Sequence, residues 1–310
     1  MPGIGVINNP RSRQNIKHPE RMRRLAYILG EGGSSKATRS FEELDEVAEE
    51  FKRQDIDILA LNGGDGTNHI TLTTFLRIYG DKPLPKIALL RGGTLNTISN
   101  ACDIKGRPSG ILFNLVEKYS NGEEFEITER NMLKVGDKYG FIFGNGIVAN
   151  FMDTYYEVET PTPVHAAKTV LRGIGSLFIW GPTIRKWFRP VKAKVTVDGT
   201  VLPINRWVSL LAGTIREIGL DFRVYHRCSE EPGAFHLIGL TSNPAWIVLD
   251  MPSFFFGRAI HPRVGFETTP KKVLIEAEEP FTYTIDGDMY KTKTGVLELS
   301  IGPRLQLIVR

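Results

Sequence analysis

Three observations predict an α/β domain followed by an all-β domain. Up to about residue 125, short apolar runs alternate with segments whose apolar residues recur at helical spacing. Two of these runs end in a Gly-Gly pair, and later in the chain alternating apolar and polar residues dominate. Repeated strand–helix units form a parallel sheet with helices on both faces, whereas period-two runs separated by turn residues are typical of an antiparallel sandwich.

The first half supplies the strands and helices of the α/β domain. Helical spacing is clear where Phe41, Leu44, Val47, Ala48 and Phe51 recur between acidic residues. In order, we expect a strand at 4–7, a basic helix at 18–29, a weak strand closing at 37–38, a helix at 41–51, a buried strand at 56–61, a helix at 68–79, a strand at 86–90, and helices after residue 96 and at 111–119. Ligands in such sheets bind at the carboxyl ends of the strands.

The pattern of residues in the second half of the chain predicts an antiparallel sandwich. Asp198-Gly199 and Asp286-Gly287 are hairpin-turn signals. Expected strands lie at 192–197, 207–211, 235–240, 273–277, 281–285 and 296–301, with one helical insertion near His165–Leu177. We therefore expect domains at 1–127 and 128–304, with residues 305–310 returning to the first domain.

Composition narrows the function classes. The 310 residues are 41% apolar and 24% charged, and the net charge of +4 is too small to indicate nucleic-acid binding by itself. The two cysteines, Cys102 and Cys228, are far apart, which favours a reduced, cytoplasmic compartment. Residues 1–16 lack a signal-peptide core, and no apolar run approaches bilayer length, so we expect any membrane association to be peripheral. The six histidines show no metal-site spacing.

The glycine pairs open two similar loops, Gly63–Thr67 and Gly92–Asn96. Each follows an apolar strand and leads through Thr and Asn into an expected helix. Glycines let backbone N–H groups approach an anion, and a helix N-terminus adds donors and a positive dipole end. Either loop alone is explained by a strand-to-helix turn with an N-cap. The pair predicts a nucleotide site, and Asp65 would suit a phosphate whose charge is partly carried by a metal ion.

Of two familiar phosphate-binding motifs, the sequence excludes the P-loop and argues against the dinucleotide fingerprint. The P-loop needs a lysine after its glycines, and none follows here. The dinucleotide fingerprint fails because His69 stands where its third glycine is needed. The next strand ends at Leu90-Arg91 and offers no acidic residue for a ribose.

Asn9-Pro10, Gly63-Gly64-Asp65-Gly66-Thr67 and Gly93-Thr94-Leu95-Asn96 occur in the order seen in the diacylglycerol kinase catalytic-domain family, which the chain resembles over nearly its whole length. Bacterial lipid kinases, sphingosine kinases and, distantly, NAD kinase belong to that family. Asn131–Val135 resembles the entry to its second domain, and Asp286-Gly287-Asp288 resembles its Asp-Gly-Glu motif. The resemblance implies a Rossmann-like domain, then a β-sandwich, with the active site in the cleft between them.

The resemblance also implies the activity and its residues. It implies transfer of the γ-phosphate of ATP, with Mg²⁺, to a hydroxyl of diacylglycerol or a related lipid. Spacing alone favours a hairpin-turn role for Asp288, but the residue matches the proton acceptor of bacterial relatives, and with the resemblance that role is favoured. Asp65 would serve the metal ion or the acceptor. The residues expected to line the nucleotide site are Asn9, Pro10, Arg11, Ser12, Arg13, Thr38, Gly63, Gly64, Asp65, Gly66, Thr67, Asn68, Gly93, Thr94 and Asn96.

Three positions depart from the family pattern. Arg13, in the loop after the first strand, stands where the family usually has glycine, and Asp288 stands where it usually has glutamate. The stretch that holds a structural Mg²⁺ in bacterial relatives is altered to Ser229–Ala234, so that metal site is not carried over.

A lipid acceptor requires an apolar approach to the protein. Leu171–Phe188 combines aromatic and basic residues that suit an anionic bilayer, with core packing as an equal alternative. Met251–Arg258 is a second candidate, for which core packing is favoured. The expected partners are thus a lipid substrate and a transient membrane surface, with phospholipid metabolism as the setting and a homodimer left open.

Two other functions remain open from the sequence. One is a soluble kinase of a polar acceptor, similar to NAD kinase. The other is a nucleotide-binding regulator without catalysis, which the three departures keep open and which Asp65 and Asp288 argue against.

Overall fold

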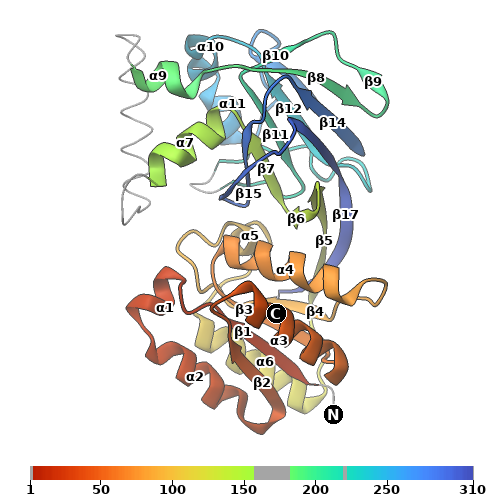
Figure 1. Ribbon diagram of the computed structural model, residues 1–310. Coiled ribbons are helices and arrows are strands. Elements are labelled where there is room, and N and C mark those ends of the chain that lie inside the picture. Colours follow the sequence, from red (N-terminus) through yellow and green to blue (C-terminus); the bar gives the residue numbers. More distant parts are fainter. Residues whose placement is uncertain (1–2, 157–181, 219–221, 310) are drawn as a thin grey trace. The chain divides into compact units, whose positions relative to one another are not determined.

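The computed structural model describes residues 3–156, 182–218 and 222–309 (Figure 1). The helical insertion predicted at His165–Leu177 lies outside these ranges. The chain divides into two compact units: unit 1 comprises Met1–Arg130 and Arg304–Arg310, and unit 2 comprises Asn131–Pro303.

Unit 1 is built on a parallel sheet in the order β2-β1-β3-β4. The strands are β1 (Ile4–Asn8), β2 (Gly33–Ala37), β3 (Ile58–Asn62) and β4 (Lys86–Leu89). Asn8 is level with Ala37 on one side and with Asn62 on the other. The carboxyl ends of these strands therefore stop at one edge, where the sequence predicts a ligand site.

Helices cover both faces of this sheet (Figure 1). They are α1 (Arg13–Lys17), α2 (Glu20–Leu29), α3 (Phe41–Gln54), α4 (Asp65–Tyr79), α5 (Thr97–Ala101) and α6 (Pro108–Asn121), with a 3-10 turn η1 (Gly30–Gly32) after α2. Leu25 of α2 and Leu112 of α6 share one core with β1 and β3. On the other face, Phe51 of α3 packs on Phe75 of α4, with ring centroids 6.4 Å apart.

Local chemistry fixes where these helices begin and end. Ser40 caps α3 by accepting a 3.2 Å hydrogen bond from the Glu43 N–H, and the helix ends at Asp55, whose φ is 56°. Proline opens α6 at Pro108, and Gly122, with φ 69°, closes it. The predicted helices at 41–51 and 111–119 are therefore confirmed, each with a longer extent.

Unit 2 is an antiparallel sandwich. One sheet has the order β10-β8-β14-β17, with β5, β6 and β9 at its side, and the other has the order β13-β12-β11-β7-β15-β16. The strands are β5 (Ile127–Val135), β6 (Lys138–Gly140), β7 (Ile142–Asn145), β8 (Val191–Val197), β9 (Thr200–Val201), β10 (Arg206–Trp207), β11 (Ser209–Gly213), β12 (His236–Leu240), β13 (Gly265–Thr268), β14 (Lys272–Ala277), β15 (Thr282–Ile285), β16 (Asp288–Lys291) and β17 (Val296–Ile308). Val195 and Leu299 from the first sheet share one buried core with Phe143 and Leu237 from the second. The predicted Rossmann-like and sandwich folds are thus confirmed.

The second sheet is covered on its other face by helices. Unit 2 contains α7 (Ile147–Tyr156), α9 (Pro182–Trp187), α10 (Pro244–Leu249) and α11 (Met251–Phe256). Ile247 of α10 and Phe254 of α11 pack against Leu211 and Ile238 of the sheet. The last residues of β17 belong to unit 1, where Leu307 pairs in parallel with Ile87 of β4.

Candidate nucleotide-binding site

The first glycine loop runs directly from β3 into α4. The helix begins at Asp65, three residues before the predicted start, so Asp65, Gly66 and Thr67 form its first turn. Its first intrahelical bond joins the Asn68 N–H to the Gly64 carbonyl at 3.0 Å. The N-cap residue is Gly64, which has no side chain to occupy the earlier donors. These N–H groups at the positive end of a 15-residue helix suit an anion.

The two glycine loops lie directly against each other. A Cβ on Gly93 would lie 2.4 Å from the Gly64 Cα, and a Cβ on Gly63 would lie 2.3 Å from the Thr67 Cβ. A Cβ on Gly92 would lie 2.4 Å from the Asn62 Oδ1. Such distances are far below van der Waals contact. Glycine is therefore needed at Gly93 for the two loops to meet, and at Gly63 and Gly92 for packing against Thr67 and Asn62, whether or not a ligand binds.

Asp65 joins the first loop to the second. Its carboxylate accepts hydrogen bonds from the Thr97 N–H at 3.0 Å and the Ile98 N–H at 3.1 Å, which are the first donors of α5. Burial raises the pKa of Asp65, while the two backbone hydrogen bonds and the charge of Arg91 act in the opposite direction. The Asp65 carboxylate therefore occupies the anion position at the N-terminus of α5.

The loop after β1 contacts both glycine loops. The Asn9 side chain donates to the Thr67 hydroxyl at 2.8 Å, and the Ser12 hydroxyl donates to the Gly92 carbonyl at 3.3 Å. The Asn9 Oδ1 also accepts from the Arg11 N–H at 2.9 Å, which holds the loop in a tight turn. Asn9 and Ser12 thus join the loop after β1 to Thr67 of the first glycine loop and to Gly92 of the second.

A buried network of asparagine side chains supports these loops, and Asn8, Asn15 and Asn62 in it were not among the residues predicted for the site. The Asn62 Nδ2 donates to the Asn8 Oδ1 at 2.8 Å, and the Asn15 Nδ2 donates to the Asn9 carbonyl at 2.8 Å. The Asn62 Oδ1 has no hydrogen-bond partner among the described residues. The sequence signal that could have revealed this network is that both β1 and β3 end in an asparagine, Asn8 and Asn62.

The other predicted nucleotide residues lie at the same edge of unit 1. The Thr38 N–H donates to the Asn8 carbonyl at 3.0 Å, just beyond β2. Asn96 adopts φ 50° and exchanges hydrogen bonds with Gly93, whereas Thr94 between them is exposed. Among the other predicted residues, Pro10 is partly buried, Arg11 is exposed, Arg13 opens α1, and Asn68 is buried in α4.

Asp286 and Asp288 lie at the β15–β16 hairpin of unit 2. Asp286 and Gly287 adopt φ values of 48° and 94°, as the predicted turn requires. The Asp286 carboxylate accepts from the N–H groups of Phe141 at 3.0 Å and Ile142 at 2.8 Å, so it fastens the hairpin. Asp288 is the first residue of β16 and is partly buried. Burial, followed by the charge of Asp288, raises the pKa of Tyr290.

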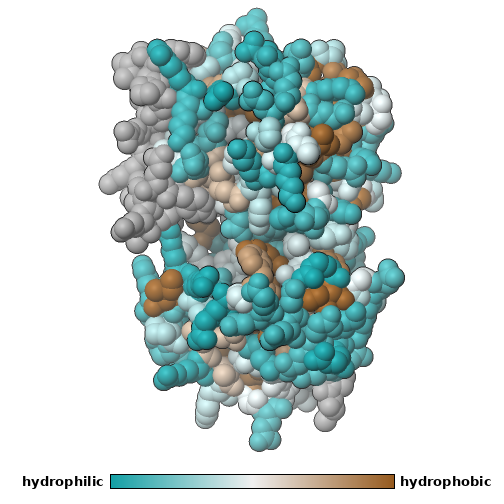
Figure 2. Space-filling view, viewed as in Figure 1, coloured by the Kyte–Doolittle hydropathy of each residue, from teal (hydrophilic) through white to brown (hydrophobic). Residues whose placement is uncertain are grey.

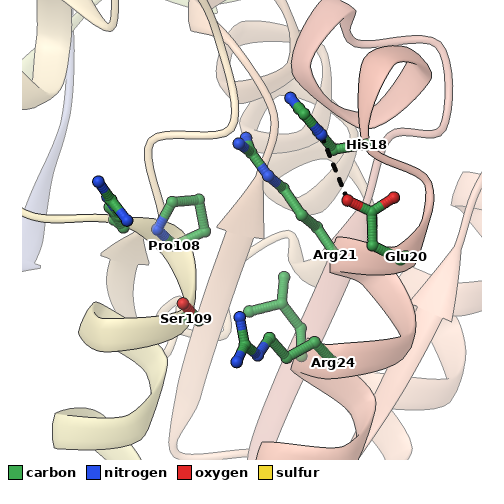
Figure 3. Close-up of a pocket in the computed structure, with 8 residues that line it drawn as sticks. His18, Glu20, Arg21, Arg24, Pro108 and Ser109 are labelled. Atoms are coloured by element: carbon green, nitrogen blue, oxygen red, sulfur yellow. Dashed lines mark ion pairs between the residues drawn. The ribbon is translucent and has the colours of Figure 1, made fainter.

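A basic cavity of about 530 Å³ lies between α2 and the start of α6 (Figure 3). Figure 3 shows Arg21 and Arg24 on α2, across from Pro108 and Ser109 of α6. The cavity is also lined by Arg107, and by His18 and Glu20, whose side chains pair at 3.3 Å. None of the predicted nucleotide residues lines it. Guanidinium groups beside the N-terminus of α6 make this a second, separate region that attracts anions.

Exposed apolar side chains gather on α10 and α11. Trp246, Leu249, Phe255 and Phe256 are 38%, 70%, 41% and 56% exposed. The interpretation of Met251–Arg258 as core packing is therefore correct for buried Phe254 and wrong for Phe255 and Phe256. Residues 171–181 of the other candidate, Leu171–Phe188, lie outside the described ranges. Within its described part, Trp187 is buried and donates to the Thr154 hydroxyl at 3.0 Å.

The face of the molecule drawn in Figure 2 is mostly polar. Figure 2 shows hydrophilic residues over most of the face drawn, with apolar residues in small separate groups. Among the described helices, none combines the length and the apolar character needed to cross a membrane.

Comparison with known proteins finds a matching family model and solved structures of the same fold. Residues 3–123 match the family model of the diacylglycerol kinase catalytic domain, and no curated protein matches the chain. A solved diacylglycerol kinase from Bacillus anthracis str. Sterne is 14% identical, with a TM-score of 0.68 and coverage of 99% of this chain and 97% of that chain. Two candidate diacylglycerol kinases from the same strain are each 16% identical: one has a TM-score of 0.72 with 99% and 95% covered, and the other 0.67 with 99% and 97%. The shared fold and the family match together confirm, for the glycine-loop domain at 3–123, the resemblance to the diacylglycerol kinase catalytic-domain family.

Proposed function

We propose that this protein is an ATP-dependent lipid kinase that transfers the γ-phosphate of ATP to a hydroxyl of diacylglycerol or a related long-chain lipid. One observation carries the proposal. The N-terminus of α4 lies in a Gly-Gly-Asp-Gly-Thr loop, has no side-chain cap, and packs through Gly64 against Gly93 of the second loop. The match of residues 3–123 to the diacylglycerol kinase catalytic domain supports the same activity.

The residues at this edge fit the phosphates of ATP. The first N–H groups of α4 offer hydrogen bonds and a positive dipole end, and the hydroxyls of Ser12 and Thr67 lie beside them. When bound, ATP would supply the γ-phosphoryl group, and its Mg²⁺ would neutralise charge on the phosphate oxygens. The Asp65 carboxylate already accepts two hydrogen bonds from the N-terminus of α5. We therefore assign Asp65 mainly to holding the two loops together, with binding of the metal ion as a secondary role.

Asp288 is our candidate for the proton acceptor. A partly buried carboxylate can take the proton of an attacking hydroxyl, and phosphoryl transfer requires such a group near the acceptor. Asp288→Asn should lower kcat by about 100-fold or more, with ATP affinity little changed. Asp137→Asn, an exposed carboxylate in the same unit, is the matched control. Full turnover of Asp288→Asn would remove this residue from the mechanism.

The exposed patch on α10 and α11 is our candidate for contact with the membrane that contains the lipid. Arg258 lies over the Phe256 ring at 5.4 Å, and Arg263 lies over the Trp246 ring at 5.1 Å. Aromatic rings beside cations suit an anionic interface. Flotation with anionic vesicles should carry the protein, and Leu249→Ser with Phe256→Ser should abolish it. Phe113→Ser, which removes an exposed ring from unit 1, should not.

A transfer assay tests the activity. ATP and Mg²⁺ are supplied with a panel of long-chain lipids in mixed micelles and with soluble alcohols and NAD, and phosphorylated product is measured. Phosphorylation of diacylglycerol supports the proposal. Turnover of only soluble acceptors would indicate an NAD kinase-like enzyme, and ATP binding without any turnover would indicate a regulator; either result contradicts the proposal.

A further inference from the structure

Two histidines and a glutamate meet inside unit 2. His226 lies in the turn before β12, His236 is the first residue of β12, and Glu267 lies in β13. The His236 Nε2 is 3.4 Å from the Glu267 Oε2, and the His226 Nε2 is 3.6 Å from the Glu267 Oε1. One ligand atom from each residue lies within 4.8 Å of the other two.

The sheet register explains why His236 and Glu267 lie close together. Glu267 pairs with Ile238 across the antiparallel β12–β13 ladder, and His236 precedes Ile238 by two residues. Side chains two apart on a strand share a face, so His236 and Glu267 are diagonal neighbours on one face of the sheet. His226 is added from the turn, with its ring centroid 5.0 Å from that of His236.

The cluster is buried, and its polar atoms are poorly satisfied. His236 is 0% exposed, and the side chains of His226 and Glu267 are 16% and 13% exposed. Among the described residues, the His226 Nδ1, both His236 ring nitrogens and the Glu267 Oε2 have no hydrogen-bond partner. Buried polar atoms in this state are normally matched by another group.

We propose that His226, His236 and Glu267 bind a divalent transition-metal cation, with Zn²⁺ as the best match. Two imidazoles and one carboxylate are an established ligand set for Zn²⁺, which leaves a fourth position open. Bonds of about 2.1 Å in tetrahedral geometry place ligand atoms about 3.4 Å apart. The spacings of 3.4 Å to the Glu267 Oε2 and 3.6 Å to the Glu267 Oε1 are close to this value. With one ligand atom from each residue, the longest spacing is at most 4.8 Å and needs to close by at most about 1.4 Å.

The main alternative is a set of ion pairs in which protonated histidines face Glu267. In that arrangement each imidazolium N–H would donate a hydrogen bond to a Glu267 oxygen, yet neither His236 ring nitrogen nor the Glu267 Oε2 has a hydrogen-bond partner among the described residues. The nearby cation, Arg227, is itself paired with Glu230 at 2.7 Å.

The sequence did not reveal this site. The histidines show no metal-site spacing along the sequence, because His226, His236 and Glu267 are brought together only by a turn and a strand ladder. A bound ion would fasten the turn that contains His226 to the β12–β13 ladder. This inference does not depend on the proposed kinase activity.

Zinc titration of the full chain tests the site. After removal of metal with a chelator, binding is measured by competition with a chromogenic zinc chelator. We expect one Zn²⁺ per chain, and affinity reduced by more than about 100-fold in His226→Gln and Glu267→Gln. His261→Gln, which changes an exposed histidine that stacks on Trp246, is the matched control and should bind as the wild type does.

A second measurement guards against misfolded variants. Co²⁺ bound to the wild type should give the visible absorption bands of a tetrahedral site, and Zn²⁺ should raise its melting temperature. Both effects should be absent in Glu267→Gln. The absence of stoichiometric zinc binding in the wild type, or equal affinity in the wild type and the two site variants, would overturn the proposal.

Discussion

The two glycine loops of unit 1 have similar sequences, but the helices that follow them have different N-termini. At α4, Gly64 leaves the first backbone donors without a side-chain cap. At α5, the same positions donate to the Asp65 carboxylate at 3.0 Å and 3.1 Å. One helix therefore has a position for an external anion, whereas the other already holds an internal one.

This difference separates the binding loop from the supporting loop. Asp65 belongs to the first turn of α4 and reaches the start of α5, so a single side chain fixes both helices. The close contact between Gly64 and Gly93 also holds the two glycine loops together. We infer that the second loop holds the first in position and that the phosphates bind mainly at α4.

The largest effect is expected from separating the two loops. In Gly93→Ala, the new Cβ would lie 2.4 Å from the Gly64 Cα, a backbone atom that cannot rotate away. We expect a loss of about 3 kcal/mol in the free energy of unfolding, measured with urea, together with loss of kinase activity. Gly110→Ala is the control, because nothing lies within 4 Å of its Cβ. Normal stability in Gly93→Ala would show that the loops do not touch.

Asp65→Asn should have the next largest effect. An amide oxygen can replace only part of a carboxylate that accepts from two N–H groups, and the amide NH₂ is itself a donor. We expect a loss of about 2 kcal/mol in stability. Asp45→Asn, at an exposed ion pair with Arg77, should cost little. Unchanged stability combined with an altered Mg²⁺ requirement would instead assign Asp65 to the metal ion.

Thr67→Val tests the link between α4 and the loop after β1. The change removes the hydroxyl that accepts from Asn9 at 2.8 Å while keeping a similar side-chain volume. We expect a loss of about 1 kcal/mol in stability and a higher KM for ATP. The exposed Thr200→Val in β9 is the comparison. An unchanged KM would separate the Asn9–Thr67 contact from nucleotide binding.

The smallest effect concerns a thiol that follows α5. Burial raises the pKa of Cys102 to about 11, so the unreactive thiol form persists at pH 8 and the thiolate forms only as the pH rises toward 11. Iodoacetamide should therefore modify Cys102 much more slowly in the folded protein than after unfolding, as peptide mass spectrometry can measure. Gly93→Ala should accelerate the reaction if it loosens α5, whereas Gly110→Ala should not.

The sequence was sufficient for the strand–helix order and for the paired loops, because these depend on local patterns. It could not reveal that Asp65 reaches Thr97, since that contact depends on the spacing between β3 and β4. Asn62 was missed because its role depends on the register that places it level with Asn8. His236 and Glu267 were missed for the same reason, since only the strand ladder makes them neighbours.

Amide NMR spectra of the full chain, recorded during titration with ATP, test the difference between the two helix termini most directly. The account predicts large shifts for the N–H groups of Asp65, Gly66 and Thr67 at α4. The N–H groups of Thr97 and Ile98, which already donate to Asp65, should change little. Large shifts at Thr97 and Ile98 with none at the start of α4 would contradict it.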